Sequence, residues 1–350
     1  MLKKYIYRIA ICGCAFLALP ACGDDELDPE SIFSTEEQEL DPNSASYELD
    51  KWCEDNYLKP YNLQFRYKMQ DVGTDMDYNL VPATYSNAVD LAVLTKYLWF
   101  EVYDKVVSPD FLKLYGPRII HLIGSPAYNP ANGTMILGLA EGGLKVSLFR
   151  VNEMVVTDFD QLNEFYFKTM HHEFAHILHQ TKTYPREFDE ISVDYYDPMG
   201  WQDRNMELCY SLGFTSDYAS SEAREDFAET IANYITKTDE QWNYMLEAAA
   251  YGWQQQYDEN GLPVEDELTG KPVCDQVADF DGVDGPSVIL QKVQIARDWF
   301  RDAWGMDLDE LRAEVQYRQL NYDIDELRAQ VYDILPDGGD AADSESATNE

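Results

Sequence analysis

The sequence predicts an α+β fold in which a small twisted sheet precedes a mainly helical C-terminal lobe. In the first half of the chain, short apolar runs that suit strands alternate with segments of helical periodicity. After about Asn205, nearly every segment repeats its apolar residues at three- and four-residue steps. Between the two regions lies an unbroken helical pattern that contains four of the chain's five histidines.

The N-terminus predicts a lipoprotein signal peptide over residues 1–21. A basic start is followed by Ile9–Leu19, an apolar run that is too short to span a membrane. The run ends at Leu19-Pro20-Ala21-Cys22, which resembles a lipobox. Cys22 is therefore expected to be lipidated, so that an acyl chain and not a spanning helix would anchor the protein. A simple secretory peptide cut near the same point is the alternative.

Three further parts are predicted behind the signal peptide. Residues 22–43 are acidic and contain Pro and Ser, which is typical of a tether. Residues 44–335 are long enough for one large domain or two packed lobes. Residues 336–350 are acidic and lack apolar periodicity, so this tail is expected to be disordered.

The elements before the histidine cluster are expected to alternate in type. Helical periodicity covers Ser44–Lys59 and Ser86–Val106, and strand-like runs cover Leu63–Met69 and Pro117–Ile123. Glu141-Gly142-Gly143 is expected to turn a hairpin between the strands Thr134–Leu139 and Leu144–Val151. A strand shortly before a catalytic helix can pair with an extended peptide, so Leu144–Val151 is the expected partner of a substrate.

The next segment, Asp160–Gln180, is predicted to be one helix. It contains no Pro or Gly, its apolar residues recur at helical steps, and Asp158 or Asp160 can cap its N-terminus. Within it, His172 and His176 lie four residues apart and therefore on one face. Glu173 points to the side, where it can reach a water on a metal held by the two imidazoles. This H-E-x-x-H pattern predicts a zinc hydrolase.

The other two histidines are not expected to bind the metal directly. His179 lies on nearly the same face as His172, but two turns further along, about 10 Å away on a straight helix. No glycine turn lets the chain double back. His179 is expected to pack or to support a ligand, and His171 points off the ligand face.

A third zinc ligand should come from a later helix, because a catalytic zinc takes three protein ligands and keeps one open position. The candidate begins at Ser220 or Ser221 and carries Glu225 and Glu229 on one face. One carboxylate can bind the metal while the other hydrogen-bonds a histidine. Spacing alone is equally compatible with a solvated acidic face, and Asp226 can replace Glu225 if the helix phase differs.

The pentad, a gap of about fifty residues and Glu-Asp-Phe-Ala-Glu at 225–229 resemble zinc peptidases of the lethal-factor type, a gluzincin group. The resemblance covers about residues 170–235. It implies that Glu225 is the third ligand and Glu229 supports a histidine. It also implies that Tyr218, seven residues before Glu225, stabilises the oxyanion.

A second resemblance covers most of the chain. The stretch His-Glu-Phe-Ala-His-Ile-Leu-His-Gln at 172–180 resembles zinc-metallopeptidase lipoproteins associated with nutrient import, the substrate import-associated zinc metallohydrolase lipoprotein family. This implies an outer-membrane lipoprotein and a TonB-dependent importer as a partner. Gly-Asp-Asp-Glu-Leu-Asp after Cys22 looks like the surface-export signal of such lipoproteins. The cell surface is therefore the expected location.

The segments after the candidate ligand helix have recognisable helix ends. Thr238 and Gln241 form a capping box, and Gly305 is placed to end the helix Ser287–Trp304. A short repeat, Asp307–Val315 and Asp323–Val331, is expected to form two small amphipathic helices.

The net charge of −39 excludes nucleic acid and anionic lipid as partners bound by charge. A loose acidic cluster at Asp275–Asp284 suggests calcium, although its spacing misses the twelve-residue loop. Besides Cys22, Cys53, Cys209 and Cys274 remain after cleavage, and an oxidising compartment permits one disulfide among them without showing which.

Together these features predict a zincin-like peptidase with one zinc ion, anchored at the outer membrane, whose substrate is a peptide or protein. The alternative is a zinc-containing, non-catalytic lipoprotein that captures a substrate for a TonB-dependent importer. The pentad fixes the metal chemistry but not the bond that is cut, so a hydrolase of another bond stays open.

Overall fold

A computed structural model describes residues 40–69, 80–128, 135–136, 138–141, 145–267 and 270–334. The chain divides after Asp41 into two units, and the description below concerns the second, residues 42–350. The predicted signal peptide with its lipidation site at Cys22, most of the tether and the acidic tail lie outside the described residues. So do Gly142 and Gly143 of the predicted hairpin turn.

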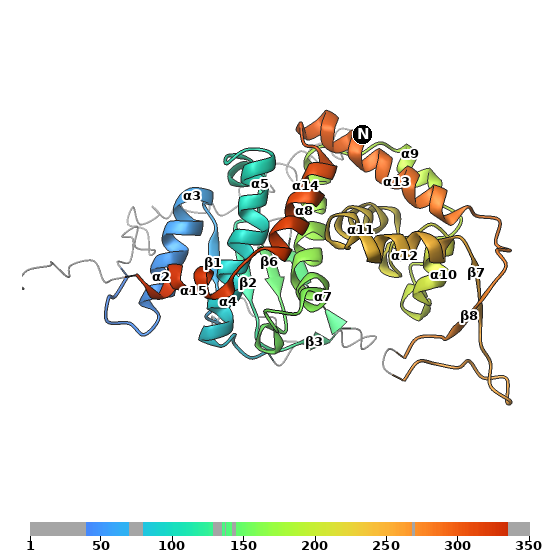
Figure 1. Ribbon diagram of the computed structural model, residues 1–350, viewed down its shortest axis with the longest axis horizontal. Coiled ribbons are helices and arrows are strands. Elements are labelled where there is room, and N and C mark those ends of the chain that lie inside the picture. The colour runs from blue at the N-terminus through green and yellow to red at the C-terminus, as the bar shows by residue number, and fades with distance from the viewer. Residues whose placement is uncertain are drawn as a thin grey trace, which may run out of the picture. The chain divides into compact units, whose positions relative to one another are not determined.

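A four-stranded mixed sheet forms the centre of the N-terminal half, as predicted (Figure 1). Its order is β1-β2-β6-β5, with β1 (Gln64–Arg66), β2 (Ile119–Leu122) and β6 (Lys145–Leu148) parallel and β5 (Gly138–Glu141) antiparallel to β6. Ile120, Leu122, Val146 and Leu148 are almost fully buried, which is typical of strands covered by helices. The short pair β3 (Ala127–Tyr128) and β4 (Met135–Ile136) lies outside this sheet.

The expectation that Leu144–Val151 pairs with a substrate is wrong. β6 lies between β2 and β5, so its backbone groups are already paired on both sides. Among the described strands, β5 and β1 lie at the two edges of the sheet, and β5 contacts the helix that carries the histidines. The sequence shows that a hairpin exists but not which arm ends the sheet, because sheet order depends on long-range pairing.

The helices before the sheet's last strands surround a core of aromatic side chains. They are α2 (Tyr47–Cys53) with α3 (Lys59–Tyr61), α4 (Tyr85–Thr95) with α5 (Glu101–Val106), and α6 (Phe111–Tyr115). The π-helical turn η1 (Glu54–Leu58) joins α2 to α3, and the π-helical turn η2 (Lys96–Phe100) joins α4 to α5. A π turn adds a residue without ending the helix, so it changes the phase of the faces on either side.

The predicted histidine helix is present as one run, α7 (Phe159–Leu162), the π turn η4 (Asn163–Phe167) and α8 (Lys168–Thr181). Asp158 caps it by accepting a hydrogen bond from the backbone N–H of Gln161. Phe174 of α8 packs against Trp99 and Tyr103, with ring centroids 5.3 and 5.2 Å apart. This packing fixes the rotation of α8 and thereby the direction of its histidines.

The C-terminal half is mainly helical, as predicted. Its main helices are α10 (Met206–Ser211), α11 (Ala223–Thr236), α12 (Asp239–Ala249), α13 (Gly285–Trp299) with the π turn η7 (Phe300–Trp304), α14 (Leu308–Leu320) and α15 (Ile324–Tyr332). Shorter pieces are η3 (Val151–Glu153), α9 (Glu187–Ile191), η5 (Trp201–Asp203) and η6 (Tyr218–Ser220). α14 and α15 are the two repeats, each capped by an aspartate side chain at Asp307 or Asp323.

Two other predicted helix ends are confirmed. Thr238 and Gln241 form the complete capping box, and Gly305 ends the helical run in the left-handed conformation, with φ of 66°. One element was not expected: β7 (Gly252–Gln255) and β8 (Cys274–Val277) form an antiparallel pair in a long arm. Most of the side chains of these two strands are polar, so they show no apolar alternation that could reveal them.

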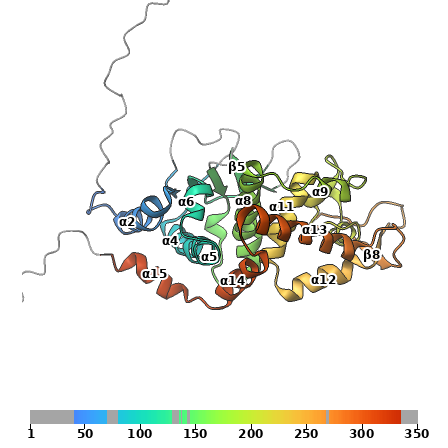
Figure 2. The same ribbon diagram turned by 90° about the horizontal axis from the view of Figure 1, so that it is seen from above.

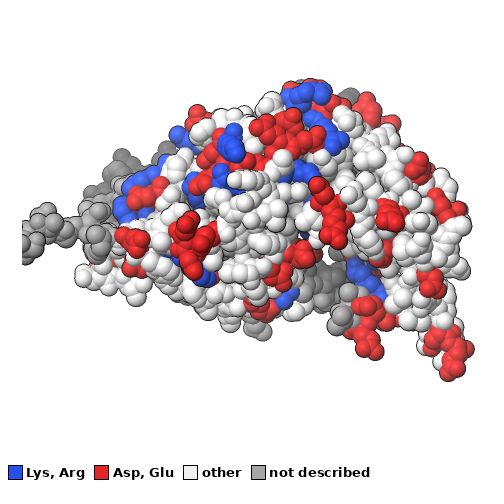
Figure 3. Space-filling view, viewed as in Figure 1, with Lys and Arg blue, Asp and Glu red and all other residues white. Residues whose placement is uncertain are grey.

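The surface bears mixed charge. Figure 3 shows basic side chains interspersed among the acidic ones on the face that it presents, and ion pairs such as Arg328–Asp90 and Lys105–Glu314 join separate helices. In the described part of the chain, no helix is both long and apolar enough to cross a membrane. Cys53, Cys209 and Cys274 are all free thiols.

Candidate metal centre

The centre lies between α8 and α11, which are neighbours in both ribbon views (Figures 1 and 2). Contacts between the helices run in opposite directions along the two sequences. Lys168 and His172 of α8 approach Glu229 of α11, and His176, one turn later, approaches Glu225, one turn earlier. The two helices are therefore antiparallel, and side chains spaced four residues apart on each meet in successive layers.

Three side chains bring one atom each to a common point. The Nε2 atoms of His172 and His176 are 3.0 Å apart, and Oε2 of Glu225 lies 3.1 Å from each of them. Bonds of 2.0–2.1 Å around a tetrahedral zinc separate the ligand atoms by about 3.3 Å. The triangle therefore has nearly the size that three zinc ligands require. Within the described part of the chain, this is the one group of His, Cys, Asp or Glu side chains found to suit a metal ion.

The electrostatics of this triangle also favour a cation. Burial opposes a charge on His172, yet Glu225 and Glu229 raise the pKa of that imidazole to about 10. Burial would raise the pKa of Glu225, but His172 and His176 lower it below its ordinary range. The site thus stabilises positive charge between its three ligand atoms, which a divalent ion supplies more fully than a proton.

Glu229 supports His172 from behind. Its Oε1 lies 2.8 Å from Nδ1 of His172, although the ring N–H does not point straight at the oxygen, so the contact is bent. Ser216 donates a 2.6 Å hydrogen bond to Oε2 of Glu229, and Asn233 donates one of 3.1 Å. Burial would raise the pKa of Glu229, but Lys168, His172 and Ser216 lower it, so the carboxylate stays ionised. A proton on Nδ1 leaves Nε2 of His172 available for a metal.

His179 supports His176 in a similar way. Nδ1 of His176 and Nε2 of His179 lie 2.8 Å apart and share a hydrogen bond. The ring of His179 packs edge-on against Tyr184 and Phe227. His179 therefore lies outside the triangle, in agreement with the prediction, and it holds the ring of His176.

Glu173 and Tyr218 lie beside the triangle. Glu173 has no hydrogen-bond partner among the described residues, and burial raises its pKa, while His172 and His176 act in the opposite sense. The Tyr218 ring lies 5.8 Å from the His172 ring and 4.8 Å from Trp201, centroid to centroid. Burial and the nearby Glu225 carboxylate raise the pKa of Tyr218, so the phenol stays protonated.

Asp226 does not replace Glu225. Its carboxylate is fully buried on another side of α11, 2.6 Å from Nζ of Lys292, and accepts a 2.8 Å hydrogen bond from Tyr196. His171 also points away and bonds to Tyr103. The acidic cluster at Asp275–Asp284 serves local structure, since Asp284 caps α13 and Asp281 accepts a hydrogen bond from the backbone of Val283.

Sequence reasoning missed Lys168, Asn233 and Ser216, which surround Glu229. Lys168 lies four residues before His172, and Asn233 lies four residues after Glu229, so helical spacing could have identified both. Ser216 comes from the loop before η6, and no sequence pattern places it there.

Comparisons with known proteins agree with this centre. The protein in a crystal structure described as a "putative zinc-binding metallo-peptidase" from Bacteroides caccae is 37% identical. The match covers 85% of this chain and all of that one, with a TM-score of 0.63. No curated protein matches significantly. Residues 42–309 match the family described as "Putative zinc-binding metallo-peptidase". The chain thus belongs to this family of zinc-binding metallopeptidases.

Proposed function

We propose that this protein is a gluzincin-type peptidase with a zincin-like fold, in which His172, His176 and Glu225 hold one zinc ion. The observation that carries the proposal is the triangle of ligand atoms, 3.0–3.1 Å on each side, with the free carboxylate of Glu173 next to it. Two nitrogens and one carboxylate oxygen form a ligand set that zinc hydrolases use, with a fourth position left for water.

A zinc ion in this position supplies Lewis acidity, which lowers the pKa of water and polarises a substrate carbonyl. Glu173 accepts the proton of the attacking water on its carboxylate and then donates it to the departing amine nitrogen. Its raised pKa suits both steps, because a more basic carboxylate is a better proton acceptor at neutral pH.

The remaining side chains orient and stabilise. The Tyr218 hydroxyl, kept protonated by its surroundings, donates a hydrogen bond to the oxyanion that develops on the substrate. Glu229 and His179 hold the two imidazoles in the tautomers that leave Nε2 unprotonated. The outer edge of β5, which has no partner among the described strands, lies on a strand that contacts α8 and offers backbone groups to an extended peptide.

We also propose that the protein is anchored at the cell surface through Cys22 and works with a TonB-dependent importer. Support comes from the basic and apolar start, the lipobox-like Leu19-Pro20-Ala21-Cys22 and the acidic residues that follow. Labelling of whole cells with a fatty-acid analogue tests the anchor. Loss of label in Cys22→Ser is the expected result, and unchanged labelling contradicts it.

The peptidase proposal is tested with a peptide library and Glu173→Gln. The wild type, loaded with zinc, should cleave a subset of the peptides, and the variant should retain one zinc per chain with turnover lower by orders of magnitude. Equal turnover of the two proteins would reject Glu173 as the base. One zinc per chain without cleavage of any peptide would favour a binding lipoprotein over an enzyme.

A further inference from the structure

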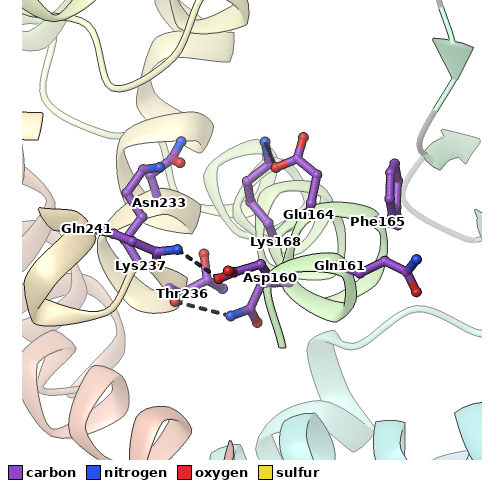
Figure 4. A pocket seen from close by; sticks show the side chains of 10 residues that line it. Asp160, Gln161, Glu164, Phe165, Lys168, Asn233, Thr236, Lys237 and Gln241 are labelled. Atoms are coloured by element: carbon purple, nitrogen blue, oxygen red, sulfur yellow. Dashed lines mark hydrogen bonds and ion pairs between the residues drawn. The ribbon is translucent and has the colours of Figure 1, made fainter. Parts of the chain in front are cut away.

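A polar cavity of about 380 Å³ lies one layer beyond Glu229, between the same two helices that hold the metal triangle. Its walls come from α7, η4 and the start of α8 on one side, and from the end of α11 and the start of α12 on the other (Figure 4). A volume of this size is in the range of ligand pockets. Lys168 and Lys237 both line it.

Most polar groups of the cavity already have partners. Lys168 lies 3.4 Å from Glu164 and 3.9 Å from Glu229 and is shared between these carboxylates. Asp160 is exposed to solvent and accepts a hydrogen bond from Gln241. The amide of Asn233 donates to Glu229.

Lys237 is the exception. It follows the last residue of α11, is half-buried, and its ammonium group has no partner among the described residues. Burial and the nearby Lys168 lower its pKa, while the carboxylates of Glu164, Glu229 and Asp160 act more weakly in the opposite sense, so the cavity as it stands disfavours this charge. A half-buried cation without a counter-ion is costly, and a bound anion would remove that cost.

The charges of the cavity limit what the anion can be. Two lysines face three carboxylates, those of Asp160 and Glu164 in the wall and that of Glu229 behind Lys168, and only Lys237 makes no direct ion pair among the described residues. A doubly charged group such as phosphate would therefore meet uncompensated negative charge, whereas a single carboxylate would pair with one ammonium group. The amide side chains in the walls, among them Gln161 and Asn233, can border a peptide backbone.

The position of the cavity connects it with the metal centre. Lys168 precedes His172 by four residues, so the two side chains lie about 6 Å apart along the axis of α8. An extended peptide advances about 3.3 Å per residue. Along the direction of α8, this separation corresponds to about two residues of an extended peptide.

We propose that this cavity is a carboxylate-binding subsite, in which Lys237 pairs with an acidic side chain or with the terminal carboxylate of a peptide. The inference rests on the proposed peptidase function for its ligand class. Lys237 is a binding residue for that carboxylate, and Lys168 keeps the cavity wall and Glu229 in place.

The test measures binding of matched short peptides to the zinc-loaded full chain by calorimetry. The first arm uses a series of alanine peptides, blocked at both ends, that carry a single Glu at successive positions. Each peptide is compared with a counterpart that has Gln in place of Glu. The other arm compares a free C-terminus with an amidated one. In at least one arm the acid should bind about tenfold more tightly than its neutral partner, as expected for a charge-assisted pair.

Three variants make the result specific. Lys237→Gln should reduce the preference to less than about threefold, while Lys237→Arg should retain most of it. Lys113→Gln removes the same charge from an exposed position in α6 and should leave the preference unchanged. Zinc content and thermal unfolding of each variant show that it is folded.

Equal affinity of acid and amide in both arms would overturn the subsite, as would a preference that persists in Lys237→Gln. A preference in the first arm identifies a side-chain carboxylate, and one in the second identifies the chain terminus. Because binding requires no turnover, a Lys237-dependent preference without cleavage would reject the peptidase and keep the subsite. Cleavage of peptides without a Lys237-dependent preference would keep the peptidase and reject the subsite.

Discussion

Nδ1 of His176 lies 2.8 Å from Nε2 of His179, three residues further along the same helix. If Nε2 of His176 binds a metal, its single proton must reside on Nδ1, so His176 donates and His179 accepts. His172 has a different support, the carboxylate of Glu229. The imidazole of His176 is thus oriented by a ring from its own helix and that of His172 by a carboxylate from α11.

We expect His179→Ala to weaken zinc binding by about 10- to 100-fold, because it removes the group that fixes the ring orientation of His176. Competition with a chromogenic chelator measures this. The matched control is His171→Phe, which alters a buried histidine of the same helix that bonds only to Tyr103. It should lower the unfolding temperature and leave the zinc affinity unchanged. Equal zinc affinity in His179→Ala and the wild type would contradict the role of His179.

Asp226→Asn should destabilise the fold without removing zinc. The substitution leaves the ammonium of Lys292, which is fully buried, without its carboxylate, and loss of one partner of a buried pair costs about 3 kcal/mol. Denaturant unfolding measures the free energy, and mass spectrometry measures the metal. Asp226→Asn combined with Lys292→Met should recover part of the loss. Loss of zinc at unchanged stability would show that Asp226, and not Glu225, is the ligand.

Tyr218→Phe should lower kcat by about 100-fold with little change in KM, because the hydroxyl is proposed to act only on the developing oxyanion. Steady-state kinetics on a cleaved peptide check this. The phenol does not ionise near neutral pH, so the effect should not vary between pH 6 and pH 8. A kcat equal to that of the wild type would limit Tyr218 to packing against Trp201 and His172.

Glu314 lies outside the candidate metal centre and makes the free energy of unfolding dependent on pH. Burial would raise its pKa, but Lys105 and Arg318, which donate hydrogen bonds of 2.5 and 2.7 Å, lower it below its ordinary value. Because its pKa is lower in the folded than in the unfolded protein, the Glu314 carboxylate stabilises the fold fully above about pH 4.3, the ordinary pKa of Glu. This stabilisation is lost as the pH falls through the lower pKa of the folded state.

Glu314→Gln should therefore reduce the free energy of unfolding by about 1 kcal/mol at pH 7, since solvent screens part of the interaction. The difference from the wild type should shrink as the pH falls below about 4. Urea unfolding at several pH values measures it. A difference that stays constant down to pH 3 would show that the ionised carboxylate contributes nothing.

The sequence predicted those features that depend on neighbours within one helix. The spacing of His172 and His176, the cap at Asp158, the capping box at Thr238 and the left-handed Gly305 are all local, and each is present in the structure. The choice between Glu225 and Asp226 needed the fold, because the buried Lys292 that engages Asp226 lies 66 residues away in the chain.

Other features could not be predicted from the sequence, because they too depend on contacts between distant segments or leave no periodic pattern. Whether β5 or β6 ends the sheet depends on pairing with β2, a strand that lies on the far side of a connection of more than twenty residues. The arm of β7 and β8 is formed by short strands in which apolar and polar residues do not alternate, so no period distinguishes it. The cavity beside Lys237 arises where three helical segments meet, and sequence periodicity does not report the space left between helices.

The central claim is that one zinc ion is held jointly by α8 and α11. A crystal structure with anomalous diffraction data collected on both sides of the zinc absorption edge tests it most directly. One peak is expected about 2.0–2.2 Å from Nε2 of His172, Nε2 of His176 and a carboxylate oxygen of Glu225. A peak bound by another set of side chains, or no peak at this position in protein that contains stoichiometric zinc, would contradict it.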